Sequence, residues 1–170
     1  MRAAIALSNA KQCSGSRREA LRRRVAVAGL AALVVLLGGC SREPDVGLPA
    51  ACGEGTSAVR EALHAAPEEV SVDGTPLSAC FDDTSDGGEV QQIGATYLAV
   101  AADLSTAATA NPDGEAAVQL AYLVGAVQRG ASGSQGIHYE LTRRLEQELD
   151  GLGPPAPEVR EALRAGRAGG

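Results

Sequence analysis

Aromatic side chains are scarce in this chain of 170 residues, which has no tryptophan, one phenylalanine and three tyrosines. A core without large rings has a modest volume, and small residues on helix faces let neighbouring helices approach closely. Small residues of this kind recur in the apolar segments of the second half of the chain: Gly94, Ala95, Ala121, Gly125 and Ala126. We therefore expect closely packed helices around a small core.

Lysine is absent after Lys11, and acidic residues dominate the chain from Cys40 onward. Residues 40–170 contain eight arginines and 20 acidic residues, so their net charge is 8 minus 20, or −12, against −6 for the whole chain. Binding to nucleic acid requires clustered lysine and arginine, so this charge excludes nucleic acid as a partner. It also opposes electrostatic adhesion to anionic lipid.

A membrane-spanning apolar run is also lacking, because the longest one covers only 13 residues, from Val25 to Leu37. A helix that crosses a bilayer needs roughly 20 apolar residues. Three arginines at 22–24 precede the run, and Gly38-Gly39-Cys40 follows it. A basic region, an apolar stretch and small residues, in that order, are typical of a cleaved signal peptide.

The end of this run, Leu37-Gly38-Gly39-Cys40, resembles the lipobox of bacterial membrane lipoproteins. The resemblance implies a signal peptide over residues 1–39, cleavage between Gly39 and Cys40, and a diacylglyceryl group on the Cys40 sulfur, with a fatty acyl group such as palmitate on the new amino terminus. It places the domain on the extracytoplasmic face of the cell membrane. The alternative is an uncleaved amphitropic helix that ends at Cys40.

Two further resemblances concern the export route and the remainder of the chain. The segment at 16–22, Ser-Arg-Arg-Glu-Ala-Leu-Arg, is similar to a twin-arginine export signal but lacks the usual phenylalanine, so general secretory export stays open. The alanine-rich, lysine-free remainder is similar to uncharacterised lipoproteins of actinobacteria. Neither resemblance implies an activity.

Cysteine usage fits export. Cys13 would leave with the signal peptide and Cys40 would carry lipid, which leaves Cys52 and Cys80 as a pair. A disulfide is expected for such a pair in an oxidising compartment, and closing its loop restricts the unfolded chain by about 3.5 kcal/mol. A metal site with either histidine is disfavoured because no Cys-x-x-Cys or His-x-x-x-His spacing exists.

The chain after the lipobox predicts an all-α fold, a small four-helix bundle on a tether. Residues 40–51 read as a tether of at most roughly 40 Å, residues 52–153 as a disulfide-stapled helical domain, and residues 154–170 as a short C-terminal helix with a frayed tail. The segment Val70 to Leu77, with Asp73-Gly74 inside it, predicts a small hairpin or an irregular crossing.

Apolar residues recur at helical spacing in four segments of the domain. These are 57–66, a stretch of about 20 residues from a capping box at 86–89, a helix from Asn111-Pro112 to Gly130, and one from about Gln135 to the glycines at 151 and 153. Tyr97 and Tyr122 would rim a contact surface if their hydroxyl groups faced outward.

Three patterns resemble catalytic or ligand-binding motifs. Residues 53–58 have the letters of a dinucleotide-binding loop, but no strand is expected before them, so a glycine turn and a helix cap are favoured. Asp82, Asp86 and Glu89 could bind a cation, although Ile93 stands where an EF-hand has its closing glutamate. The third pattern is a hydrolase constellation of Ser134, His138 and Glu140, which lacks a Gly-x-Ser-x-Gly turn.

No motif in the sequence identifies a reaction or a cofactor. We therefore expect a lipid-anchored envelope protein whose domain is a non-catalytic interaction or accessory module, with the membrane as one partner and an unidentified envelope protein as another. A small-ligand or cation-binding lipoprotein is the alternative, and a hydrolase around His138 is the third hypothesis.

Overall fold

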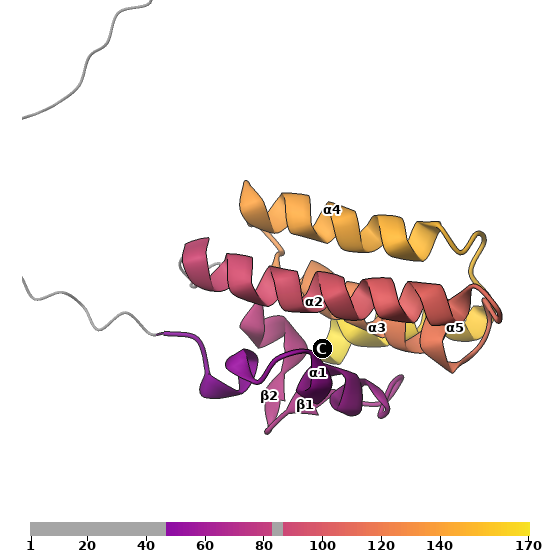
Figure 1. Cartoon of the computed structure of the whole chain (residues 1–170), viewed down its shortest axis with the longest axis horizontal. Helices are drawn as coiled ribbons and strands as arrows, with labels where there is room; N and C mark the ends of the chain where they lie inside the picture. The colour runs from indigo at the N-terminus through magenta and orange to yellow at the C-terminus, as the bar shows by residue number, and fades with distance from the viewer. Residues whose placement is uncertain (1–46, 83–86) are drawn as a thin grey trace, which may run out of the picture. The chain divides into compact units, whose positions relative to one another are not determined.

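A computed structural model describes residues 47–82 and 87–170 of the chain (Figure 1). The predicted signal peptide, Cys40 and the first part of the predicted tether lie outside the described residues. The same holds for residues 83–86, which include Asp86 and most of the predicted capping box.

The described residues form an all-α fold with one very short hairpin, which confirms the predicted fold class. In chain order the elements are η1 (Ala50–Gly53), α1 (Thr56–Leu63), β1 (Ser71–Val72), β2 (Thr75–Pro76), η2 (Leu77–Cys80), α2 (Gly87–Ala108), α3 (Glu115–Gly130), α4 (Ile137–Asp150) and α5 (Pro157–Gly169), where η marks a 3-10 helix. The described residues thus contain the four predicted bundle helices and the predicted C-terminal helix, and that last helix, α5, packs against α3 as part of the bundle.

Helix α3 lies at the centre of the bundle and contacts α2, α4, α5 and η2. Every residue from Gln119 to Val127 is buried, so the helix has no solvent face along its middle. A helix that is apolar on all sides must be covered on all sides. In Figure 1, α2 and α4 lie side by side, with α1 and the hairpin on the opposite side of α2 from α4.

The hairpin alternative for Val70 to Leu77 is confirmed. Strands β1 and β2 are antiparallel, and Val72 pairs with Thr75, which leaves Asp73 and Gly74 as a two-residue turn. Both turn residues have positive φ, 47° for Asp73 and 75° for Gly74. Asp-Gly is a favoured sequence for two-residue hairpin turns because such turns require positive φ at both positions.

Helix α3 begins later than predicted. It starts at Glu115, with Gly114 as its N-cap, instead of at Asn111-Pro112. The N–H of Gly114 donates to the carbonyl of Asn111 at 3.0 Å, so residues 111–114 form a turn before the helix. This segment has asparagine at its first position, proline at its second and glycine at its fourth, which is the residue pattern favoured in type I turns.

The expectation of a frayed C-terminal tail is wrong. Helix α5 continues to Gly169, and Gly166 and Gly170 are both buried. A Cβ atom on Gly166 would overlap the carbonyl oxygen of Tyr122, and one on Gly125 would overlap that of Leu163. Helices α3 and α5 therefore touch backbone to backbone, which only glycine at these positions permits.

The predicted tether also extends too far into the domain. Leu48 packs against the core, and Ala51 and Cys52 in η1 are about nine-tenths buried. The N–H of Cys52 donates to the carbonyl of Pro49 at 2.9 Å and closes a turn at the start of η1. The ordered domain therefore includes residues that the sequence pattern, broken by proline and glycine, assigned to the tether.

Candidate functional site

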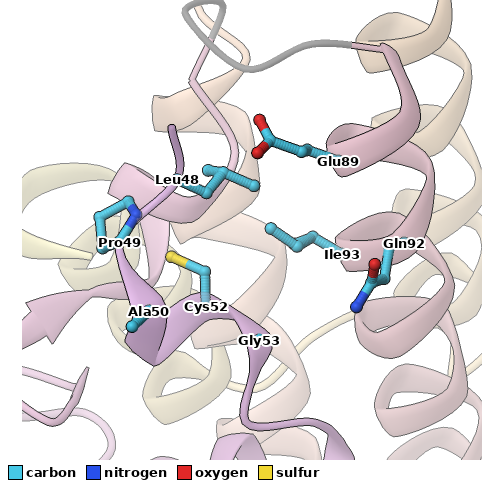
Figure 2. A pocket seen from close by; sticks show the side chains of 8 residues that line it. All are labelled: Leu48, Pro49, Ala50, Cys52, Gly53, Glu89, Gln92 and Ile93. Atoms are coloured by element: carbon cyan, nitrogen blue, oxygen red, sulfur yellow. The ribbon is translucent and has the colours of Figure 1, made fainter. Parts of the chain in front are cut away.

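A cleft lies between the start of the domain and the first turns of α2 (Figure 2). Its volume is about 190 Å³. The residues that line it come from the segment around η1 and from α2: Leu48, Pro49, Ala50, Cys52, Gly53, Glu89, Gln92 and Ile93. Figure 2 shows Leu48 and Ile93 facing each other, with the Glu89 carboxylate at the edge beside Leu48.

The disulfide fixes one wall of this cleft. Cys52 is joined to Cys80 with their Cα atoms 5.4 Å apart, as the sequence predicted. That separation lies within the ordinary range for disulfides. Cys80 in η2 is 1% exposed and anchors η1 to the core. Because the Cys52 sulfur is bonded, it offers no thiol to the cleft.

The chemistry of the cleft is limited. Ligand pockets for drug-sized molecules usually measure about 300–1,000 Å³, so this cleft is small for such a ligand. Its polar side chains are one carboxylate, Glu89, and one amide, Gln92. Such a lining suits a few-atom polar ligand or a single inserted side chain.

No group of three or more histidine, cysteine, aspartate or glutamate side chains is placed to hold a metal ion within residues 47–82 and 87–170. Asp86, the middle residue of the predicted cation site, lies outside those ranges. Binding of a cation by Asp82, Asp86 and Glu89 therefore stays a prediction.

His138 supports the fold at the start of α4. Its Nε2–H donates to the backbone carbonyl of Asp82 at 3.1 Å, and its ring meets Phe81 edge to face at 5.4 Å between centroids. The histidine is 8% exposed. It therefore joins α4 to the chain just before α2, a contact between residues 56 positions apart.

The predicted hydrolase constellation does not form a hydrogen-bonded relay. Glu140 binds Arg143 and Arg144 at 2.9 and 3.0 Å instead of His138. These hydrogen bonds hold the pKa of Glu140 at about 2, well below its ordinary value. The Ser134 hydroxyl oxygen is buried without a hydrogen-bond partner. A catalytic relay needs hydrogen bonds from the nucleophile to the base and from the base to the acid, and the hydroxyl of Ser134 makes none.

A second hollow, of about 210 Å³, lies beside α4. Its lining is mostly polar: Gln128, Ala131, Ser134, Tyr139, Thr142, Arg143 and Glu146. Several of these groups already bind one another or their own helix. Gln128 donates to Glu146 at 2.6 Å, and Thr142 donates to the His138 carbonyl at 2.8 Å.

His64 belongs to a polar cluster that no sequence pattern indicates. Its Nδ1 lies 3.0 Å from a Glu115 carboxylate oxygen and 3.1 Å from the Gln119 amide nitrogen, which donates to the same carboxylate at 2.8 Å. His64 and Glu115 are 51 residues apart. The cluster ties the end of α1 to the first turns of α3.

Tyr97 and Tyr122 do not face outward, so they form no rim of a contact surface. Both are buried, at 2% and 1% exposure. The Tyr97 hydroxyl donates to the Leu77 carbonyl at 2.9 Å, and the Tyr122 hydroxyl accepts from the Val70 N–H at 3.0 Å. Burial raises the pKa of Tyr97. Each tyrosine thus satisfies a buried backbone group of the hairpin region.

Comparison of the chain with family models, curated proteins and solved structures finds no match. Among residues 47–82 and 87–170, no helix has the length and apolar character needed to cross a membrane. The functional interpretation therefore depends on the chain's own residues and geometry.

Proposed function

We propose that the protein is a lipid-anchored domain on the extracytoplasmic face of the cell membrane. In this proposal Cys40 carries the lipid, and the helical bundle acts as a non-catalytic interaction module for another envelope protein. The observation that carries the proposal is the order of residues 22–40, with three arginines, a 13-residue apolar run and Leu-Gly-Gly-Cys at its end.

The disulfide supports the predicted compartment. Disulfides persist in oxidising environments outside the cytoplasm and are rare in cytosolic proteins. Cys52 and Cys80 are joined across 28 residues, and their bond holds η1 against η2. A domain with few large side chains gains stability from such a cross-link, because its core is small.

An interaction role is favoured by the form of the domain. Its net charge from Cys40 onward is −12, so it stays soluble and attracts basic partner surfaces. Glu140, the acid of the hydrolase hypothesis, pairs with Arg143 and Arg144 instead of with a histidine. The bundle therefore offers a charged surface.

Substitution of Cys40 tests the anchor. Cells that produce the Cys40→Ala variant should show no incorporation of a labelled fatty acid into the protein, and the signal peptide should stay uncleaved. The Cys13→Ala variant is the matched control, because Cys13 lies within the predicted signal peptide and should leave labelling intact. Labelling and normal processing of Cys40→Ala would refute the proposal.

A further inference from the structure

Two large apolar side chains are exposed in the described part of the chain, and they lie two residues apart. Ile137 is 38% exposed and Tyr139 is 66% exposed. Both belong to the first turn of α4. The pair is too small to form a stable protein interface alone, but it differs from the charged surface around it.

This pair lies at the end of the bundle where the chain enters the domain. Gly47 is next to Glu89 in the first turn of α2, and a Cβ atom built on it would be 3.8 Å from the carboxylate. His138 binds the carbonyl of Asp82, five residues before α2 begins. Figure 1 accordingly shows the starts of α2 and α4 at the same end as the first described residues.

The length of chain outside the described residues limits how far this end can be from Cys40. Seven steps separate Cys40 from Gly47, and at about 3.4 Å per residue they span at most about 24 Å. Helix α2 has 22 residues and is about 33 Å long. A lipid on Cys40 therefore restrains the Gly47 end of the bundle more tightly than the opposite end.

We infer that the Ile137 and Tyr139 end of the bundle rests on the bilayer. The inference depends on the proposed lipid anchor at Cys40. Tyrosine favours the membrane interface, where its ring contacts apolar groups and its hydroxyl contacts water. Two side chains would not hold a soluble domain on a membrane, but an anchor raises their effective concentration at the surface and makes the contact intramolecular.

The charges of the described residues at this end nearly cancel. Glu140, Arg143 and Arg144 on α4 sum to +1, and Asp82 and Glu89 bring the total to −1. The contact therefore suits a zwitterionic surface better than an anionic one. The appropriate probe is therefore a phosphatidylcholine vesicle.

The absence of tryptophan from the chain provides a clean test. The lipidated protein with Tyr139→Trp is inserted into phosphatidylcholine vesicles, with and without bromine on the acyl chains. We expect roughly two-fold lower emission in the brominated vesicles, because an aromatic ring at the interface lies next to the quenching chains. The matched control is Ala110→Trp, an exposed position in the turn after α2, whose emission should be equal in both vesicles.

Flotation of the vesicles separates the two ways in which this can fail. If the wild-type protein does not float with the vesicles, the proposed anchor is wrong and the orientation falls with it. If the protein floats but Tyr139→Trp is quenched no more than Ala110→Trp, the anchor stands and the orientation is wrong. That second result would assign the exposed pair to a protein partner.

Discussion

The contact between α5 and α3 differs in kind from the contact between α4 and α2. Helix α5 meets α3 through backbone atoms, because Gly166 and Gly125 leave no side chain between the two helices. Helix α4 meets α2 through side chains, with Leu141 filling the space above Gly94. The first contact has no atom that can move aside, whereas the second has a flexible leucine. The difference predicts where the fold tolerates an added methyl group.

The two interfaces also differ at their edges. Arg129 of α3 donates to the carbonyls of Arg167 and Ala168, which closes the end of α5. The first turn of α4 instead leaves Ile137 and Tyr139 exposed. The end of α5 is thus held to α3 by hydrogen bonds, whereas the first turn of α4 presents two exposed apolar side chains.

The largest expected effect is at Gly166. The Gly166→Ala variant places a methyl group on the Tyr122 carbonyl, and we expect a loss of about 3 kcal/mol in the free energy of unfolding, since overpacking against backbone forces the helices apart. Gly169→Ala is the control on the same helix, because its added methyl meets nothing. Urea denaturation of both variants measures the difference, and equal stabilities would contradict the backbone contact.

Removal of the Tyr122 hydroxyl group should have the next largest effect. The Tyr122→Phe variant leaves the buried Val70 N–H without an acceptor, which we expect to cost about 2 kcal/mol of unfolding free energy. Tyr139→Phe is the control on α4, where the tyrosine is exposed and no loss is expected. Thermal denaturation measures the Tm of both variants. Equal changes in Tm would show that the Tyr122 hydroxyl group has no structural role.

A methyl group at the α2 and α4 interface should have a smaller effect. In Gly94→Ala the three atoms nearest to the new methyl group all belong to the Leu141 side chain, which can change rotamer. The better helix propensity of alanine offsets part of the crowding, so we expect a net change below about 1 kcal/mol. A loss in urea denaturation as large as that of Gly166→Ala would remove the distinction between the two interfaces.

The smallest effect concerns the surface of α4. Hydrogen bonds from Arg143 and Arg144 lower the pKa of Glu140 from 4.5 to about 2, so these contacts stabilise the folded state above pH 4.5, and the stabilisation is lost as the pH falls through about 2. Glu140→Gln should therefore lower Tm slightly at neutral pH and leave it unchanged below the folded pKa. Melting curves across this pH range measure the difference, and a Tm loss that is independent of pH would contradict it.

The parts of the fold that follow local rules were predictable from sequence. Apolar residues at helical spacing, such as Val90, Ile93 and Tyr97, located α2, and Asp73-Gly74 located the hairpin. Capping and turn residues were less decisive, because Asn111-Pro112 fits the start of a helix and a turn equally well. The structure resolves this ambiguity in favour of the turn.

Contacts between distant residues were not predictable in the same way. No hydropathy pattern indicates the contact between Gly125 and Gly166, because glycine contributes no side chain and the two positions are 41 residues apart. The cleft around Leu48 combines a segment that resembles a linker with α2. Only the disulfide between Cys52 and Cys80 could be inferred, because elimination left one pair of cysteines.

The intact mass of the protein extracted from membranes without reduction tests the account most directly. We predict a chain that begins at Cys40 and carries the mass of a diacylglyceryl group, with Cys52 and Cys80 lacking two hydrogens because they are joined. A mass that corresponds to the full chain from Met1, or to a chain without lipid at Cys40, would contradict the proposed anchor.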